Sequence, residues 1–394
     1  MTRIGIVGNG VAAVTAVRET RKLVPEAEIH VFSDEAVGYY PRPKLIDVVG
    51  GRLTEQEVIR YHPDWYENNN VDLHISEPVI RIDPLSMALV TSSASYERFD
   101  RMLIATGSHP FVPPIKGVEK SGVCVLRTLD DALTIREWTD RTDSQIIVGA
   151  GVLGVEIAAA IRAAGGDPLV ISNTNQILPA QLDEGATDML IRRLTDMGIE
   201  VVLDFLCSEV LGDERVTGVV STKGDRLDGG LMVVATGIRS NIELAKDAGI
   251  KCDRGILVDN HMETTARGVY AAGDCMEWNG RCGGIIPTAL DTARVAARNM
   301  FDFGSATYEG TVPSNTLKVA GIDLTSIGTI RPETDDHDTI VVRDEETACY
   351  YKAVLKSDIV VGAIVLGDAR IARKMRGLIT SRERIEDRSS LFEP

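Results

Sequence analysis

The 394-residue sequence predicts an α/β protein with two similar three-layer domains, one inserted in the other, followed by a small α+β C-terminal domain. Two observations predict this organisation. A pattern of apolar strand, glycine-rich turn and alanine-rich helix occurs twice, and each copy later ends in an Ala-Thr-Gly segment. After about residue 308 the pattern changes to short alternating segments, which are typical of a small antiparallel sheet.

The first copy of the repeat consists of the strand Ile4 to Val7 and a turn that contains Gly8, Gly10 and Ala13. Such a turn between a buried strand and a helix lets the backbone approach a pyrophosphate, whose charge then lies at the helix N-terminus. We therefore expect these three residues to bind a dinucleotide. A single turn of this kind is a weak signal, because it also occurs for structural reasons.

The second copy has the strand Gln145 to Val148 and a turn that contains Gly149, Gly151 and Gly154. Both turns follow an apolar strand and open a helix rich in alanine and valine, which is the context that supports dinucleotide binding. The segments that end the two copies are Ala105-Thr106-Gly107 and Ala235-Thr236-Gly237. Two Rossmann-like domains of similar size are therefore predicted.

Domain boundaries follow from the segments outside the repeat. A strand at 269–271 and a helix from Thr288 to about Phe301 belong to neither copy, so they most simply complete the first sheet. The first domain would then comprise 1–107 and 238–308, and the second, 108–237, would be inserted in it. Residues 309–394 would form the C-terminal domain with a basic tail.

Composition restricts the class of protein. Hydrophobic residues make up 44% of the chain and charged residues 25%, as in soluble globular proteins. The formal net charge of −16 argues against nucleic-acid binding. The longest uncharged stretches fall short of the roughly 20 apolar residues of a membrane helix. A strand that starts at Arg3 leaves no room for a signal peptide, so we expect a cytoplasmic protein.

An acidic residue at the end of the second strand of each copy would bind the ribose hydroxyls of an adenosine. In the first copy Asp34 or Glu35 can do this, although a solvated acidic turn is the alternative. In the second copy the strand runs into Ser172-Asn173-Thr174-Asn175, with neither an acid nor an arginine. These residues do not distinguish NADH from NADPH.

Asp274 follows a strand and a small-residue turn and directly precedes Cys275. A buried carboxylate needs hydrogen-bond donors. The ribityl chain of a flavin offers hydroxyls for this purpose, and a turn aspartate that caps its own backbone is the alternative.

The order of these motifs resembles the flavoprotein superfamily with two dinucleotide-binding domains. The segments "YYPRPKL", "VYAAGDC", "YEGTVPSNTLKVAGIDLTSIG" and "YYKAVLKSDIVVGAIVLGD" narrow the resemblance to the group of rubredoxin reductases and nitrite reductase flavin domains. It implies FAD in the first domain and NADH or NADPH in the second. The residues implied to lie along FAD are Gly8, Gly10, Ala13, Asp34, Arg42, Pro43, Val79, Ala105, Thr106, Gly107, Gly273, Asp274, Ile286, Pro287 and Thr288.

For the nicotinamide cofactor, the resemblance implies that the second glycine turn holds the pyrophosphate, Glu156 approaches the carboxamide and Gly237 flanks the site. One position departs from the pattern. Relatives often have a lysine beside the flavin where this chain has Asp47, and Lys44 is the alternative cation.

Six cysteines, at 124, 207, 252, 275, 282 and 349, are scattered without CxxC spacing, and we expect reduced thiols that lie mostly in the core. Disulfide reductases of the superfamily store electrons in a cysteine pair, and its peroxidases and oxidases use one cysteine near position 40. The first 123 residues here contain none. We therefore expect no catalytic side chain, with the flavin passing electrons directly to an external acceptor.

The expected function is electron transfer from NAD(P)H through FAD to a one-electron carrier, with rubredoxin as the first candidate by resemblance. One alternative is the flavin subunit of an NADH-dependent nitrite reductase system, which would need a second polypeptide for the siroheme. Another is a flavoprotein that binds NAD(P)H in signalling or assembly and turns over slowly. The C-terminal domain would border the flavin or a homodimer interface.

Two further patterns concern partners and metals. The stretch from Ala369 to Arg388 holds seven basic and three acidic residues, and with Lys318 and Lys352 it could steer an acidic carrier. A solvated helix face is the alternative. The six histidines show no ligand spacing, so no metal site is expected. Trp65, with Tyr61 and Tyr66, is expected to fill a core or an interface.

Overall fold

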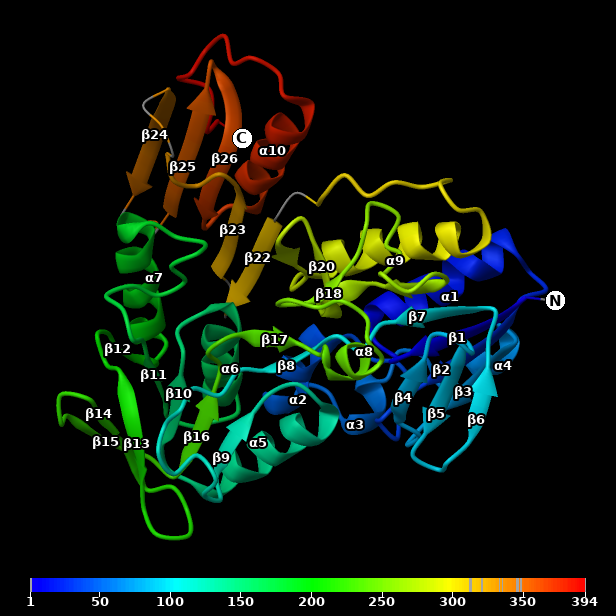
Figure 1. The fold of residues 1–394 in the computed structure, drawn as a ribbon. Coiled ribbons are helices and arrows are strands. Elements are labelled where there is room, and N and C mark those ends of the chain that lie inside the picture. Colours follow the sequence, from blue (N-terminus) through cyan, green and yellow to red (C-terminus); the bar gives the residue numbers. More distant parts are fainter. Residues whose placement is uncertain are drawn as a thin grey trace. The chain divides into compact units, whose positions relative to one another are not determined.

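The computed structural model shows two compact units (Figure 1). It describes residues 2–311, 314–319, 322–332, 334, 336–344, 347 and 349–393, with the backbone alone for 314–319 and 322. Unit 1 comprises Met1–Lys44, Leu53–His109 and Ile238–Thr311, and unit 2 comprises Leu45–Arg52, Pro110–Gly237 and Val312–Pro394. None of the helices in these described ranges is long and apolar enough to span a membrane.

Unit 1 is built on a five-stranded parallel sheet with the strand order β19-β7-β1-β2-β3. These strands are β1 (Arg3–Val7), β2 (Glu28–Phe32), β3 (Val71–His74), β7 (Arg101–Ile104) and β19 (Val269–Ala271). The late strand β19 pairs with β7, so the segment after the second repeat does complete the first sheet.

Both faces of this sheet are buried because successive side chains of a strand point to opposite faces. Ile4, Ile6 and Leu103 lie in one core, whereas Met102 and Ile104 lie in another. The first core also contains residues of α1 (Val11–Leu23) and α9 (Ile286–Phe301), which pack against each other (Figure 1). Tyr66 lies in that core with Tyr61 and Trp65 packed against it, which confirms the prediction for these aromatic residues.

The other elements of unit 1 are short. They include the antiparallel sheet β4-β5-β6, the three-stranded sheet β18-β20-β21, and the pair β8-β17 near the points where the chain passes between the units. Their bounds are η1 (Arg42–Lys44), α3 (Glu55–Val58), α4 (Pro63–Asn68), β4 (Val79–Asp83), β5 (Ala88–Thr91), β6 (Tyr96–Arg98), β8 (Ser108–Pro110), β17 (Ile238–Ser240), α8 (Glu243–Asp247), β18 (Ile256–Leu257), η2 (Gly273–Cys275), β20 (Met276–Trp278) and β21 (Arg281–Cys282).

Unit 2 contains a second five-stranded parallel sheet with the order β12-β11-β10-β16-β9. It matches the first sheet strand for strand, except that the position of β19 is taken by an upstream strand, β9. The antiparallel sheet β13-β14-β15 of unit 2 corresponds to the sheet β4-β5-β6 of unit 1. The bounds are α2 (Leu45–Val49), β9 (Val123–Val125), α5 (Leu129–Arg141), β10 (Gln145–Val148), α6 (Val152–Ala163), β11 (Pro168–Ile171), α7 (Glu184–Asp196), β12 (Glu200–Val202), β13 (Cys207–Leu211), β14 (Gly218–Ser221), β15 (Arg226–Asp228) and β16 (Leu231–Val234).

The C-terminal part of unit 2 is an antiparallel sheet with the order β22-β23-β26-β25-β24 and one long helix, α10. The helix and one sheet face share a core that includes Leu355, Val365, Ile371 and Met375. This confirms the predicted α/β fold with an α+β C-terminal part. The bounds are β22 (Ser314–Val319), β23 (Ile322–Gly328), β24 (His337–Asp344), β25 (Cys349–Lys356), β26 (Ile359–Leu366) and α10 (Ala369–Ser381).

Candidate cofactor-binding sites

The first glycine turn requires glycine at its first position. Gly8 has a φ of +105°, and a Cβ there would lie 2.4 Å from the carbonyl oxygen of Ala105. Its N–H donates to the carbonyl of Phe32 at 2.8 Å, and Ala105 donates to Val7 at 2.8 Å. The turn is therefore held between β2 and the end of β7, and a side chain at Gly8 would collide with the backbone at the end of β7.

The N-terminus of α1 is suited to an anion. Gly10 is its N-cap residue and provides no side-chain hydrogen bond to the first turn. A Cβ at Gly10 would meet no atom within 4 Å, so the space in front of the helix is open. Unsatisfied N–H groups and the helix dipole favour a phosphate at such a place. The residues of this turn therefore fit a pyrophosphate.

Tyr66 links this turn to the "YYPRPKL" segment, a contact that was not predicted from the sequence. Its hydroxyl donates to Oδ1 of Asn9 at 2.9 Å and accepts from the N–H of Tyr39 at 3.0 Å. The ring is buried, so the hydroxyl needs both partners. Asn9 and Tyr66 are 57 positions apart in the chain, so no local sequence pattern indicates this contact.

The second glycine turn repeats this geometry in unit 2. Gly149 has a φ of +115°, and its Cβ would lie 2.4 Å from the carbonyl oxygen of Ala235. Gly151 is the N-cap of α6 without a side-chain cap, and a Cβ there also meets nothing within 4 Å. A Cβ at Gly154 would lie 1.9 Å from the Gly149 oxygen, so the third glycine is required here, whereas Ala13 is accommodated in the first turn.

The two acidic residues after β2 differ in their surroundings. Glu35 binds Arg42 at 2.6 Å and accepts a hydrogen bond from the Tyr40 hydroxyl. The guanidinium of Arg42 also lies over the Tyr40 ring, 5.0 Å from its centroid. Asp34 is exposed at the strand end. The structure thus links Glu35 and Arg42, two predicted site residues, and leaves Asp34 as the more accessible carboxylate.

Asp274 lies beside the first turn of α1. A Cβ at its neighbour Gly273 would be 3.0 Å from Cβ of Ala12. The half-buried carboxylate of Asp274 accepts a hydrogen bond from Oγ of Ser108 at 2.9 Å, and its backbone oxygen accepts one from Ser240 at 2.6 Å. Asp274 therefore has a donor within the protein, whereas its contact with ribityl hydroxyls stays a prediction. Ser108 directly follows Gly107, but no pattern indicated its role.

The start of α9 completes the set of predicted residues in unit 1. Ile286 and Pro287 are exposed, and Thr288 is buried. The carbonyl of Thr288 accepts from Oγ1 of Thr292, which itself accepts from the N–H of Gly273 at 3.1 Å. The helix start is thereby tied to the Asp274 turn. Val79 begins β4 and packs against the second core of the unit.

The threonines of the two Ala-Thr-Gly segments each donate a hydrogen bond to a backbone carbonyl elsewhere in the same unit. Oγ1 of Thr106 donates to the carbonyl of Asn241 at 3.1 Å, and Oγ1 of Thr236 donates to the carbonyl of Phe111 at 2.6 Å. Gly107 and Gly237 both have positive φ, +69° and +113°. These segments therefore shape the chain where it leaves each sheet.

Glu156 and Asp47 form an unusual pair in unit 2. Glu156 lies on α6, and Asp47 lies on α2, which packs against α6. Burial, together with the negative charge of Asp47, raises the pKa of the Glu156 carboxyl to about 7. Arg52 pairs with Asp47 at 2.7 Å. A carboxyl that keeps its proton near neutral pH can donate a hydrogen bond to an amide oxygen.

The cysteines are free thiols, as expected, but only Cys207 and Cys275 are buried, so the expectation that most lie in the core was too strong. Burial raises the pKa of both thiols to about 11. The thiol form, which is a poor nucleophile, therefore dominates at neutral pH.

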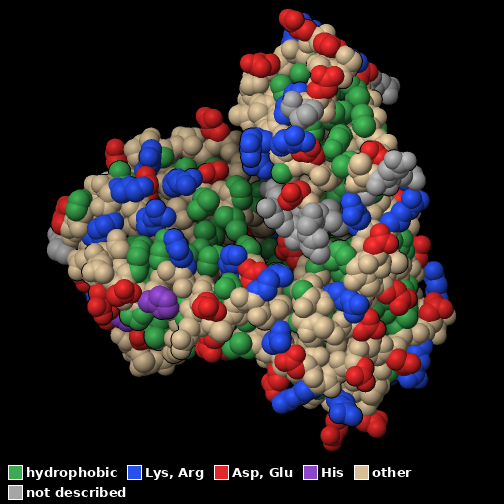
Figure 2. All heavy atoms as spheres, turned by 180° about the vertical axis from the view of Figure 1, so that it is seen from behind, with side chains coloured by type: hydrophobic (Ala, Val, Ile, Leu, Met, Phe, Trp, Pro, Cys, Tyr) green, Lys and Arg blue, Asp and Glu red, His purple; other side chains and the backbone are tan. Residues whose placement is uncertain are grey.

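In the basic C-terminal stretch, Arg370, Arg384 and Arg388 pair with aspartates. Arg370 pairs with Asp368 at 3.0 Å, and Arg388 pairs with Asp358 at 2.6 Å. Lys352 is buried and pairs with Asp183 at 2.8 Å, so the prediction that it joins a surface patch was wrong. The side chain of Lys318 lies outside the described residues. Acidic and basic side chains are interspersed over the face shown in Figure 2.

Two parallel sheets with equivalent glycine turns define a protein with two dinucleotide-binding folds. The model of the pyridine nucleotide-disulphide oxidoreductase family matches residues 2–299, and the model of the rubredoxin NAD+ reductase C-terminal domain matches residues 313–383. The chain therefore belongs to the pyridine nucleotide-disulphide oxidoreductase family.

Individual relatives agree with this assignment. The chain is 32% identical over 392 residues to nitrite reductase (NAD(P)H) of Bacillus subtilis (strain 168), which covers 99% of this chain and 49% of that protein. It is 29% identical over 390 residues to NADH-rubredoxin oxidoreductase of Clostridium acetobutylicum, which covers 99% and 97%. The crystal structure of NADH:rubredoxin oxidoreductase from Clostridium acetobutylicum has a TM-score of 0.81 at 28% identity and covers 98% and 97%. The chain thus spans about half the length of the first of these relatives.

Proposed function

We propose that the chain is an FAD-dependent NAD(P)H oxidoreductase that passes electrons to a one-electron carrier protein such as rubredoxin. The main support is the pair of equivalent glycine turns, each in front of an uncapped helix with open space at its second glycine. FAD would bind in residues 1–107 and 238–308, and NAD(P)H in residues 108–237. Residues 309–394 would form the third domain.

In unit 1 the α1 turn would hold the FAD pyrophosphate, and Asp34 would bind the adenosine ribose. The ion pair with Glu35 holds the Arg42 side chain beside the end of β2. Ser108 orients the Asp274 carboxylate, whose remaining oxygen lone pairs can accept from ribityl hydroxyls. The exposed start of α9 would present Ile286 and Pro287 to the flavin ring.

In unit 2 the α6 turn would hold the nicotinamide dinucleotide. Gly151 leaves room for the pyrophosphate, and Glu156 lies one turn further along the same helix. Its protonated carboxyl would donate to the carboxamide oxygen and so orient the ring. The hydroxyl of Ser172 is engaged with Thr174 and the carbonyl of Gln176, and no charge at this strand end selects either nucleotide.

FAD supplies the chemistry of the reaction, since a flavin accepts a hydride as two electrons and can release them one at a time. The chain positions the two nucleotides. The lack of cysteine in the first 123 residues and the burial of Cys275 support transfer without a thiol relay. The similarity to an NADH-rubredoxin oxidoreductase of Clostridium acetobutylicum and to the ferredoxin reductase component of a chlorobenzene dioxygenase of Cupriavidus sp. (strain PS12) favours a small carrier as the acceptor.

A second candidate is the flavin-containing part of a nitrite reductase system. The similarity to nitrite reductase of Bacillus subtilis extends over 99% of this chain, which favours this candidate. The siroheme step would then take place on another polypeptide or domain.

Paired glycine variants test the two nucleotide sites. Gly151→Ala should fold normally, because its Cβ meets no protein atom within 4 Å. It should lower the second-order rate constant for flavin reduction by NADH by about 10-fold or more, since the methyl group would occupy the pyrophosphate position. Gly10→Ala should instead lower the FAD content of the purified protein. Gly377→Ala, which also meets no atom within 4 Å, is the matched control. Variants that all behave like this control would overturn the proposed sites.

A further inference from the structure

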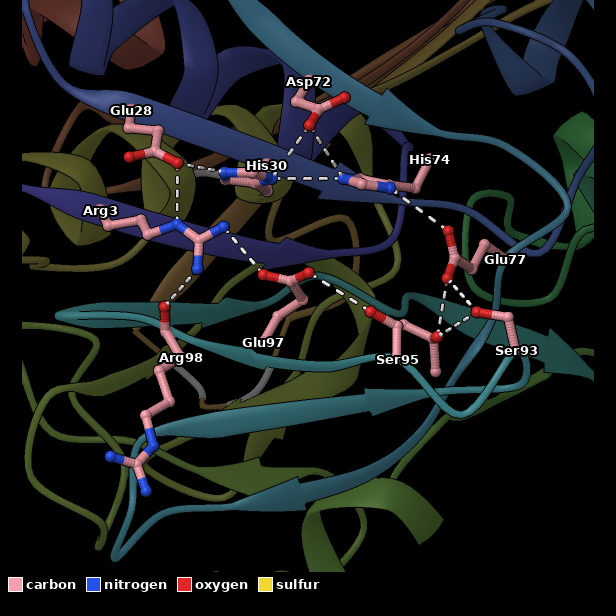
Figure 3. Close-up of polar contacts among 11 residues, drawn as sticks. Arg3, Glu28, His30, Asp72, His74, Glu77, Ser93, Ser95, Glu97 and Arg98 are labelled. Carbon is pink, nitrogen blue, oxygen red and sulfur yellow. Dashed lines mark hydrogen bonds and ion pairs between the residues drawn. The ribbon is translucent and has the colours of Figure 1, made fainter.

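Two histidines and an aspartate meet at the edge of the unit 1 sheet. His30 lies on β2, and Asp72 and His74 lie on the neighbouring edge strand β3 (Figure 3). His30 is opposite Asp72 in the register, and His74 is two residues further along, so all three side chains lie on the same face of the sheet. The sequence-based expectation that the histidines form no cluster was therefore wrong for His30 and His74.

Three potential ligand atoms converge in this cluster. Nδ1 of His30 lies 3.2 Å from Nε2 of His74 and 3.4 Å from Oδ2 of Asp72. The third distance, from Nε2 of His74 to Oδ2 of Asp72, is 3.5 Å. A tetrahedral zinc ion with bonds of about 2.0–2.1 Å would separate its ligand atoms by about 3.3–3.4 Å. An octahedral magnesium ion would require about 2.9 Å and prefers oxygen ligands.

The outer ring nitrogens of both histidines face carboxylates. Nε2 of His30 lies 2.8 Å from Oε1 of Glu28, and Nδ1 of His74 lies 3.2 Å from Oε2 of Glu77. An ionised carboxylate only accepts hydrogen bonds, so these outer nitrogens carry the protons. In a neutral imidazole the other nitrogen then has a lone pair. When both imidazoles are neutral, two nitrogen lone pairs and a carboxylate oxygen thus point to one place, where they can bind a cation.

We propose that His30, Asp72 and His74 bind one zinc ion, with the fourth position open to water. Histidine with an outer carboxylate partner is the arrangement that orients and strengthens zinc ligands. Both partners are themselves held: Glu28 pairs with Arg3 at 2.8 Å, and Glu77 accepts from Thr91 at 2.7 Å. The exposure of the ligands decreases from Asp72 (62%) through His74 (21%) to His30 (8%), which gives the ion a path from solvent.

The proposed ion would cross-link the edge strand to β2. Immediately beyond the site, the N–H of Ser33 donates to the carbonyl of His74 at 2.8 Å, and the N–H of Ser76 donates to the carbonyl of Glu35 at 3.0 Å. The ion would therefore stiffen the strand end that carries Asp34. A link between zinc and FAD retention rests on the proposed function, whereas zinc binding itself does not.

Zinc binding can be measured directly on the flavin-loaded protein. After treatment with a chelator and its removal, we expect isothermal titration with zinc chloride to show one tight site per chain, and elemental analysis after gel filtration to find one zinc ion. Magnesium chloride should not compete. The melting temperature should rise with zinc concentration, because the ion binds the folded state alone.

Two variants remove ligands, and one serves as the control. Asp72→Asn changes an exposed side chain and should fold, yet it should lose the tight site, as should His74→Gln. His62→Gln changes an exposed histidine outside the cluster and should keep one zinc ion. All variants retain the six cysteines, so a difference between them does not report binding to thiols. Failure of the wild type to bind zinc, or equal binding by Asp72→Asn, would overturn the proposal.

Discussion

Glu156 offers a test of the electrostatics at the proposed nicotinamide site. Its pKa is raised from 4.5 to about 7 by burial and by Asp47. Between these pH values the unfolded chain is ionised at this residue while the folded chain is protonated, so the stability that the raised pKa provides at low pH is lost as pH rises through about 7. At about 1.4 kcal/mol per pKa unit, the full effect is about 3 kcal/mol, which partial solvent screening reduces to about 1–3 kcal/mol.

The variant Glu156→Gln removes this titration. Relative to the wild type, its stability should increase between pH 5.5 and pH 8.5 by about 1–2 kcal/mol, or about 2–6 °C in melting temperature. The assay is thermal unfolding followed by circular dichroism on flavin-loaded protein without nicotinamide nucleotide. Glu214→Gln, at an exposed position of the same unit, should show no such trend. If Glu156→Gln and the wild type change in parallel with pH, the raised pKa is refuted.

Three further predictions concern other residues. Cys275→Ala should retain electron transfer from NADH to an external acceptor, because the thiol is buried and carries no electrons; turnover lost while the flavin is still reduced would contradict this. Ser172→Asp should raise the NADH to NADPH ratio of kcat/KM by about 10-fold or more, since a carboxylate accepts from the ribose hydroxyls and repels a 2′-phosphate; an unchanged ratio would place the ribose elsewhere. Lys352→Met should destabilise the protein by about 1–3 kcal/mol, because the half-buried carboxylate of Asp183 loses its cation but keeps its hydrogen bonds from Tyr350 and Ala186. Thermal unfolding should show a smaller loss when Asp183→Asn is added, and an equal or larger loss would argue against the pair.

Much of the fold could be predicted because it depends on local patterns. The apolar strands, the positive-φ glycines Gly8 and Gly149 and the alternating C-terminal segments all appear as short-range signals. The completion of the unit 1 sheet by the strand at 269–271 was also predicted, because this strand belongs to neither copy of the repeat. The strand β9, which takes that position in unit 2, was not predicted, because it lies upstream of the second copy of the repeat.

The contacts that shape the sites could not be read from the sequence. Tyr66 and Ser108 act on residues that are 57 and 166 positions away along the chain. The cluster of His30 with His74 depends on β2 and β3 being neighbours, which the repeat pattern alone does not state. Similarly, no signal indicated that α2 would pack with unit 2 and bring Asp47 close to Glu156. All these contacts join residues far apart in the chain, so they depend on the order of strands and helices in the fold and not on a local sequence pattern.

The proposed electron path is tested most directly by anaerobic stopped-flow spectroscopy in two steps. The oxidised protein is first mixed with NADH or NADPH while the flavin absorbance is followed, and the reduced protein is then mixed with oxidised rubredoxin. We expect rapid bleaching followed by reoxidation at or above the steady-state turnover rate, with the same rates in Cys275→Ala. Rapid bleaching without reoxidation would exclude rubredoxin as the acceptor, and slow bleaching by both nucleotides would contradict an NAD(P)H oxidoreductase and favour a binding role with low turnover.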